Sequence, residues 1–143
     1  MERKEFLKTC GFACLGGTVF SSLIAGCTSA KLISGNIANS DLVVPVASFV
    51  TKDKSFRSYI VIHNDQLEYP ICLYRFSETN YTALLMQCPH QGAELQVFGD
   101  RLQCPAHGSE FNDKGVVQTG PADTNLRSFP VTIQNDQIKI SLK

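Results

Sequence analysis

Two short segments combine the side chains best suited to binding a metal. The first is Cys88-Pro89-His90 and the second is Cys104-Pro105-Ala106-His107. Each supplies one thiolate and one imidazole, and each contains or adjoins the Gly and Pro residues that tight loops require. The chain has three histidines, and two of them fall in these segments. This clustering predicts a metal site built by two loops.

Two kinds of metal centre use two cysteines and two histidines. Zn²⁺ binds such a set as a tetrahedron around one ion. In a Rieske-type 2Fe-2S cluster, two cysteines hold one iron and two histidines hold the other. The Cys88-x-His90 spacing is uncommon for zinc, and the interlaced order lets each loop give one ligand to each iron. We therefore favour the iron–sulfur cluster and keep a structural zinc site as the alternative.

Residues 84–130 resemble a Rieske iron–sulfur domain. The resemblance is carried by the two loops Cys88-Pro89-His90-Gln91-Gly92-Ala93 and Cys104-Pro105-Ala106-His107-Gly108-Ser109. It implies that Cys88 and Cys104 hold an inner ferric iron. It also implies that His90 and His107 hold the outer iron, with their second ring nitrogens toward solvent.

Several residues near the expected cluster are expected to tune it. Ser109 could donate to a bridging sulfide, and Gly120-Pro121-Ala122 resembles the loop that covers the cluster in quinol-oxidising members. Proteins of cytochrome bc complexes carry a disulfide between the loops, where this chain has Ala93 and Ala106. They often carry a tyrosine that donates to a cysteine sulfur, where this chain has Phe111. Because donors near the sulfurs raise the potential, we expect a potential below that of bc-type clusters.

The segments that must position these loops are predicted to be short β-strands. β-Branched and aromatic runs bounded by turn residues occur at 42–50, 59–63 and 81–86. Near the C-terminus, two alternating runs flank Asn135-Asp136, which predicts a hairpin. The expected fold class is all-β, with the Rieske architecture over residues 42–143. It comprises an antiparallel β base sandwich with a small cluster-binding subdomain inserted at about residues 85–120.

The N-terminus is predicted to be a targeting segment. Residues 1–26 have a basic start followed by a mostly apolar stretch, which is typical of a signal peptide. Ile24-Ala25-Gly26-Cys27 resembles the lipobox of bacterial lipoproteins, which implies acylation of Cys27 and a stable membrane anchor. The alternative is an uncleaved anchor helix. Residues 27–41 are small and polar and are expected to form a lipidated tether.

The export route follows from the first residues. Arg3-Lys4-Glu5-Phe6-Leu7-Lys8 resembles a twin-arginine signal in which Lys4 replaces the second arginine. General secretion remains the alternative, but the twin-arginine route carries folded proteins and suits a cluster assembled before export. We expect the domain to lie outside the cytoplasm, on the periplasmic side of a bacterial membrane.

Composition limits the other function classes. The 143 residues suit one domain, and the balance of 13 basic against 13 acidic residues argues against a nucleic-acid surface. Six cysteines could suggest a disulfide scaffold. However, Cys10 and Cys14 fall in the signal, Cys27 in the lipobox, and two others in the metal loops. Only Cys72 remains, as an expected small core residue, so no disulfide is predicted.

The predicted function is one-electron transfer by a membrane-tethered 2Fe-2S protein. No catalytic residues are predicted, so the chain is a carrier or a subunit that works with redox partner proteins. The alternative is the Rieske subunit of a quinol-oxidising cytochrome complex or of an arsenite-type oxidase.

Overall fold

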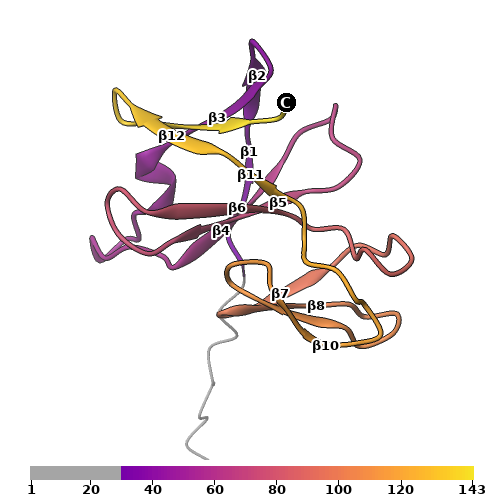
Figure 1. Ribbon diagram of the computed structural model, residues 1–143. Coiled ribbons are helices and arrows are strands. Elements are labelled where there is room, and N and C mark those ends of the chain that lie inside the picture. The colour runs from indigo at the N-terminus through magenta and orange to yellow at the C-terminus, as the bar shows by residue number, and fades with distance from the viewer. Residues whose placement is uncertain (1–29) are drawn as a thin grey trace, which may run out of the picture.

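The described chain folds into three β-sheets stacked as layers. The computed structural model describes residues 30–143, and Figure 1 shows one sheet above another. The middle sheet has the strand order β1-β4-β5-β6-β11, the upper sheet β12-β13-β3-β2, and the lower sheet β10-β9-β8-β7. The strands are β1 (Leu32–Ser34), β2 (Asn36–Ala38), β3 (Asp41–Pro45), β4 (Tyr59–His63), β5 (Ile71–Arg75), β6 (Tyr81–Leu85), β7 (Gln96–Phe98), β8 (Arg101–Gln103), β9 (Glu110–Asn112), β10 (Val117–Thr119), β11 (Ser128–Phe129), β12 (Val131–Gln134) and β13 (Gln137–Ser141).

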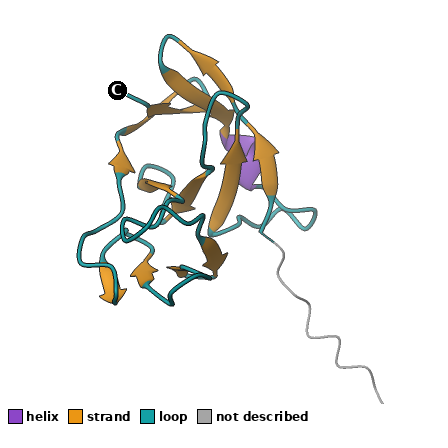
Figure 2. Cartoon of the chain, turned by 90° about the vertical axis from the view of Figure 1, so that its right-hand side faces the viewer, coloured by secondary structure: helices purple, strands orange, loops and turns teal. Residues whose placement is uncertain are grey.

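Short strands and long loops dominate the molecule, as Figure 2 shows. The one helical element of the described residues is the 3-10 helix η1 (Val46–Phe49). We expected a single strand over 42–50, but β3 ends at Pro45, which lacks the N–H needed to continue a ladder. Among residues 30–143, no helix has the length and hydrophobicity needed to cross a membrane. The all-β prediction is confirmed.

The middle sheet is buried on both faces. Successive side chains of a strand point to opposite faces, so each strand of this sheet serves two cores. Ile60 and Ile62 of β4 pack with residues of the upper sheet, whereas Val61 packs with residues of the lower sheet. Cys72 of β5 lies in the same lower core, together with both cysteines of the metal loops. This two-sided burial explains the nearly continuous apolar sequence of β4 and β5.

The lower sheet is an insertion between two neighbouring strands. β6 and β11 pair in the middle sheet, with Phe129 opposite Ala83, and the Leu85 N–H donates to the Arg127 carbonyl at 2.9 Å. The chain between them forms β7–β10 and all the loops of the predicted metal site. The expected inserted subdomain is therefore present as a layer of its own, at the bottom of Figure 1.

The turn between β9 and β10 joins the lower sheet to the middle sheet. Gly115 has φ +79°, and an added Cβ would come within 2.7 Å of the Leu84 side chain. Its carbonyl accepts the Leu126 N–H at 2.9 Å. Both the backbone conformation and the close approach require glycine here.

The C-terminal hairpin confirms the turn expected at Asn135-Asp136. Gln134 pairs with Gln137, and the two residues between them have φ of 52° and 57°. Two consecutive positive φ values define a type I′ turn, which matches the twist of the strands it joins.

The expected tether is shorter than residues 27–41. β1 and β2 lie inside that range, so the expectation is wrong from residue 32 onward. β1 pairs in parallel with β4, with Leu32 opposite Val61, whereas β2 pairs with β3. These partners satisfy the backbone of a polar segment whose composition suggested no strand. The β1–β4 pair is also parallel in a sheet that is otherwise antiparallel. Residues 1–29, with the signal and Cys27, lie outside the described residues.

Candidate metal centre

The two predicted metal loops have the same backbone structure. In the first, the Cys88 N–H donates to the Ala93 carbonyl at 2.8 Å, and the Gly92 N–H donates to the Cys88 carbonyl at 2.8 Å. In the second, the equivalent bonds of Cys104 have lengths of 2.8 and 2.9 Å, with Ser109 and Gly108 as partners. The loops are therefore two copies of one turn.

Their sequences explain this likeness. The segments 87–94 and 103–110 both follow the pattern Gln-Cys-Pro-x-x-Gly-x-Glu. Each loop is closed by its terminal Gln and Glu, which lie opposite each other across antiparallel strands. Gly92 and Gly108 have φ of 77° and 81°, a conformation that favours glycine. The loops differ in where the histidine lies, two residues after the cysteine in one and three in the other.

The four candidate ligands form an inner and an outer pair. Cys88 and Cys104 are each only 1% exposed, at the floor of the loops. His90 and His107 are exposed, and their ring centroids lie 4.9 Å apart with the ring planes nearly perpendicular. The structure thus brings His90 to His107 and Cys88 to Cys104. It separates them by chemistry, with thiols inside and imidazoles outside.

Hydrogen bonds from the loop backbone favour the thiolate form of Cys104. Burial by itself raises its pKa, but the N–H groups of His107 and Ala106, the Cys88 thiol and the Gly108 N–H together bring the pKa below its usual value. N–H groups that point at a sulfur favour its charged form. A thiolate is the form that binds iron or zinc.

Ser109 connects the second loop to the segment Gly120-Pro121-Ala122, which we call the proline loop. Its side chain is fully buried, and its Oγ accepts the Ala122 N–H at 3.0 Å. No hydrogen-bond acceptor for the Ser109 O–H is present among the described residues. The hydroxyl is thus free to donate, and its expected role toward a sulfide stays a prediction. Pro121, next in the chain to Ala122, is exposed and follows a cis peptide bond.

Apolar side chains close the floor of the site. Phe111 is fully buried, as expected for a core residue, and packs in the lower core with Leu102 and Leu126. Ala93 and Ala106 hold the positions at which related proteins carry a disulfide, and the cysteines of the described residues are all free. The cluster loops are therefore joined by hydrogen bonds and packing and not by a covalent bridge.

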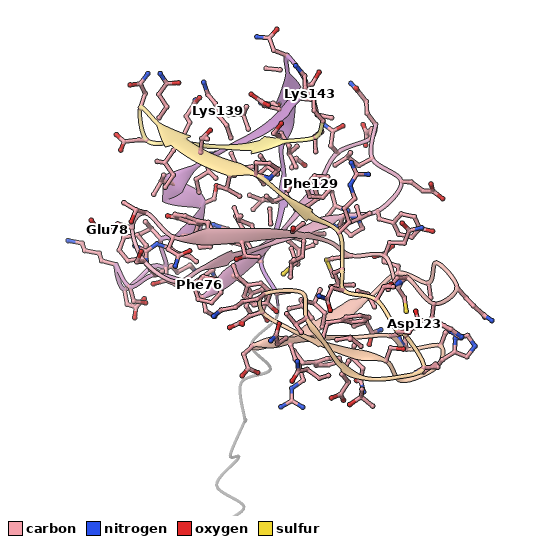
Figure 3. All side chains as sticks on the ribbon, in the orientation of Figure 1. Phe76, Glu78, Asp123, Phe129, Lys139 and Lys143 are labelled. Carbon is pink, nitrogen blue, oxygen red and sulfur yellow. The ribbon has the colours of Figure 1, made fainter. Side chains whose placement is uncertain are left out.

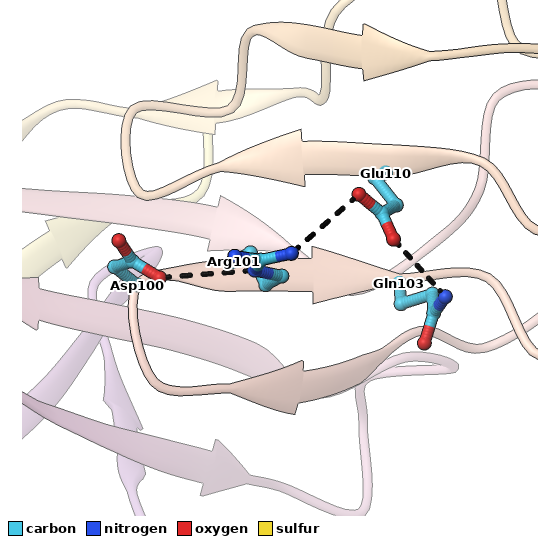
Figure 4. Close-up of polar contacts among 4 residues, drawn as sticks. All are labelled: Asp100, Arg101, Gln103 and Glu110. Carbon is cyan, nitrogen blue, oxygen red and sulfur yellow. Dashed lines mark hydrogen bonds and ion pairs between the residues drawn. The ribbon is translucent and has the colours of Figure 1, made fainter.

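The outer face of the lower sheet is polar. Figure 4 shows Arg101 between Asp100 and Glu110, with a 3.8 Å ion pair to each, and Gln103 donating to Glu110 at 3.2 Å. These partly solvated ion pairs are weak individually. The Gln103–Glu110 bond closes the base of the second loop, and Gln103 and Glu110 belong to the pattern shared by both loops.

Tyr69 is a functional candidate that the sequence did not reveal. Its hydroxyl donates to the Gly92 carbonyl at 2.8 Å, so it braces the first loop from outside the inserted layer. The two residues are 23 positions apart, and no local pattern links them.

One other cysteine and one other histidine of the described residues lie outside the two loops. Cys72 is fully buried, and its burial raises the pKa of the thiol to about 12. It is the small core residue that was expected. His63 ends β4 and is half-buried.

The ligand geometry suits a two-iron group better than a single ion. A tetrahedral zinc site needs four ligands on one point. A Rieske cluster needs two protein ligands on each of two irons. The inner thiol pair, the outer imidazole pair and the free Ser109 hydroxyl fit that requirement.

Comparison with known proteins identifies the family. The Rieske [2Fe-2S] domain family matches residues 43–130. The chain belongs to this family of iron–sulfur proteins, which bind a 2Fe-2S cluster and transfer electrons.

Among curated relatives, the oxygenase component of dicamba O-demethylase from Stenotrophomonas maltophilia is 40% identical over 75 residues, covering 46% of this chain and 22% of that protein. Cytochrome b6-f complex iron-sulfur subunit 1 of Synechocystis sp. is 39% identical over 56 residues, covering 38% and 32%. The match thus spans a third or less of these relatives' lengths.

A solved structure shows the same fold. The plasma membrane Rieske protein PetC3 from Synechocystis PCC 6803 has a TM-score of 0.51 at 21% identity, over 59% of this chain and 86% of that chain. At this identity the likeness concerns the fold alone, and it confirms the Rieske architecture predicted from the sequence.

Proposed function

We propose that the chain is a one-electron carrier whose 2Fe-2S cluster is held by Cys88, His90, Cys104 and His107 on a membrane-anchored protein. The observation that carries the proposal is the pair of matching loops, each with a buried cysteine and an exposed histidine. When bound, the cluster supplies a single reversible electron, and the imidazole side faces solvent.

The chain's own residues would determine how the electron enters and leaves. Cys88 and Cys104 would hold the inner iron in the apolar lower core, which excludes water from that side. His90 and His107 would hold the outer iron at the exposed tip, where a partner can approach. Ser109 would donate to a sulfide while its Oγ holds the Ala122 N–H, which keeps the proline loop over the site.

The anchor is part of the proposal. The lipobox-like Ile24-Ala25-Gly26-Cys27 and the basic start support acylation of Cys27 after export along the twin-arginine route. Exposure of the histidine tip suits redox partner proteins on the periplasmic side of the membrane. General secretion and an uncleaved anchor remain the alternatives to this route and anchor.

A second candidate is the Rieske subunit of a quinol-oxidising cytochrome complex. The resemblance to a cytochrome b6-f iron-sulfur subunit and the Gly120-Pro121-Ala122 loop favour it. Ala93, Ala106 and Phe111 disfavour it, because they remove the disulfide and the hydroxyl donor that go with high potential. An arsenite-type oxidase subunit remains a further variant of this alternative.

One purification tests the proposal. The full chain, extracted from membranes, is expected to contain two irons and two acid-labile sulfides and to give an electron paramagnetic signal with average g below 2. Cys104→Ser is expected to abolish the signal, and His63→Gln, the matched control, to preserve it. Colourless protein with one zinc would disprove the iron–sulfur assignment. Co-purifying cytochrome b and reduction by a quinol would favour the second candidate.

A further inference from the structure

A groove begins where the described chain begins. One cavity of about 270 Å³ lies between Ala30, Phe56 and Tyr59, and a second of about 450 Å³ lies between Tyr59, Val97 and Phe98. Ser58 and Tyr59 line both cavities, so the two are adjacent. We call this feature the N-terminal groove. It runs from Ala30 on the middle sheet to the β7–β8 turn of the lower sheet.

Exposed aromatic rings border the N-terminal groove. Phe56 is 50% exposed and Phe98 is 52% exposed. Tyr59 begins a row of three aromatic rings. The ring centroids of Tyr59 and Tyr74 lie 5.6 Å apart, and those of Tyr74 and the exposed Phe76 lie 6.4 Å apart. Figure 3 places Phe76 on the side opposite Asp123, which lies beside the cluster loops. Exposed apolar area of this kind marks an interaction surface.

The end of the N-terminal groove between Ala30 and Phe56 is basic. Lys31 and Arg57 line the groove, and Lys52 and Lys54 lie in the loop that carries Phe56, where Asp53 is the one acidic residue. The described residues as a whole hold 10 basic and 11 acidic side chains, so this excess is local. Asp100 follows Gly99 in the β7–β8 turn, and Glu78 and Asp136 line a neighbouring cavity with Phe56. Further acidic residues lie in the segments around the first cluster loop and the proline loop: Asp65, Glu68, Glu94 and Asp123.

The position of the anchor indicates what covers the groove. Cys27 precedes Ala30 by three residues, which can span at most about 11 Å. The apolar stretch 10–26 ends one residue earlier, so an uncleaved anchor would also hold the bilayer close to Ala30. Aromatic rings together with lysine and arginine are the side chains that favour the interface of an anionic bilayer.

We propose that the N-terminal groove, with Phe56 and Phe98 on its rim, rests on an anionic phospholipid bilayer. The inference depends on the proposed membrane anchoring and adds an orientation to it. Phe98 lies at one end of the β7–β8 hairpin, and the loop from Cys104 to Ser109 lies at the other end. Docking through the groove therefore directs the histidines away from the lipid. The partner that this orientation admits is a protein domain that reaches the tip through water.

A single tryptophan can report the contact, because the chain contains none. Phe98→Trp is placed in the full-length membrane-extracted protein, reconstituted in vesicles of phosphatidylcholine and phosphatidylglycerol with brominated acyl chains. Thr132→Trp, exposed on β12 and opposite Lys139 in the upper sheet, is the matched control. Each signal is divided by that in unbrominated vesicles, which removes quenching by the cluster, and the paramagnetic signal verifies folding.

Phe98→Trp is expected to be quenched by bromine at least about twofold more strongly than Thr132→Trp. Equal quenching of the two variants would overturn the proposal. In Phe98→Trp, adding Lys52→Gln and Lys54→Gln is expected to reduce the quenching to the level in pure phosphatidylcholine. Lys139→Gln with Lys143→Gln, at the far end labelled in Figure 3, is expected to leave it unchanged. An equal reduction of quenching by both pairs of lysine substitutions would overturn the role of Lys52 and Lys54 in lipid binding.

Flotation and mass spectrometry separate this inference from the anchoring proposal. Protein that floats with vesicles but shows no preferential quenching supports anchoring and disproves docking. If Cys27 is unmodified and preferential quenching is still seen, lipidation is disproved, and the groove docks on a bilayer to which the apolar stretch anchors the protein. Protein that does not float at all disproves both.

Discussion

Ser109 and Ala122 are joined by a buried hydrogen bond of 3.0 Å, in which the Ala122 N–H donates to the Ser109 Oγ. This bond fixes the proline loop to the second cluster loop although 13 positions separate the two residues. It also orients the hydroxyl so that its proton points elsewhere. Ser109 therefore has a structural and an electronic role, and the two can be measured separately.

Ser109→Ala is expected to destabilise the protein and to lower its potential. The substitution leaves the Ala122 N–H buried without a partner, which costs about 1–3 kcal/mol. It also removes a donor that favours the reduced cluster. Thermal unfolding and voltammetry are the measurements, with the exposed Ser128→Ala as the control. A lower unfolding temperature at an unchanged potential would show that the hydroxyl does not reach the cluster.

Phe111→Tyr is expected to raise the potential. Phe111 stands where related proteins place a tyrosine that donates to a cysteine sulfur, and its ring is fully buried beside the loops. A hydrogen bond to a charged group contributes about 1.5 kcal/mol, which corresponds to ~60 mV for one electron. Voltammetry should show a rise of that order, whereas Phe98→Tyr, on the exposed face, should show none. A fall in potential would contradict the expected geometry.

Tyr69→Phe is expected to loosen the first cluster loop without disturbing the core. It removes one hydrogen bond to the Gly92 carbonyl, which contributes about 1 kcal/mol. The rate at which a chelator removes iron should therefore increase. Tyr81→Phe is the matched control, since the Tyr81 hydroxyl is buried and has no partner in the described chain. Equal rates for both variants would disprove the bracing role.

Cys72 is expected to be inert to alkylation in the folded protein, because it is fully buried and its pKa is raised to about 12. The raised pKa also makes stability depend on pH. In the unfolded chain the thiol ionises near its ordinary 9.0, so this contribution is complete below that pH and is lost as pH rises toward 12. Cys72→Ala should reduce the slope of unfolding free energy against pH over this window. An unchanged slope would mean that other groups cause it.

Gly115→Ala is expected to destabilise the joint between the lower and middle sheets. The residue has φ +79°, and its Cβ would meet the Leu84 side chain at 2.7 Å. Gly99→Ala shares a positive φ of 59° but meets nothing within 4 Å. Both substitutions cost about 1–2 kcal/mol for the backbone, so a larger loss of stability in Gly115→Ala measures the clash. Equal losses would show that Leu84 moves aside.

Local sequence signals predicted much of this molecule. The Asn135-Asp136 hairpin, the buried Cys72 and the four candidate ligands follow from turn chemistry, burial and spacing over a few residues. The relation between the two cluster loops is also visible in their shared pattern of Gln, Cys, Pro, Gly and Glu.

Long-range pairing could not be predicted in the same way. β1 is a three-residue strand within a mostly polar segment, and it forms because β4 supplies its hydrogen bonds; the pairing is parallel and distant in sequence. The Tyr69–Gly92 bond likewise depends on how the middle sheet places a loop against the lower sheet. Neither contact is associated with a periodic or local pattern in the sequence from which it could be predicted.

The adjacency of Leu85 and Arg127 bears on whether the cluster-bearing layer can be exchanged between proteins. The cluster-bearing layer leaves and rejoins its scaffold through two strands that are already hydrogen-bonded neighbours. A cassette with the same end-to-end spacing could therefore be transplanted between scaffolds without cutting any other strand. Conversely, a tight turn in its place would leave β6 and β11 as an ordinary hairpin. The redox layer and the layers that carry it can thus diversify independently, each with its own partners.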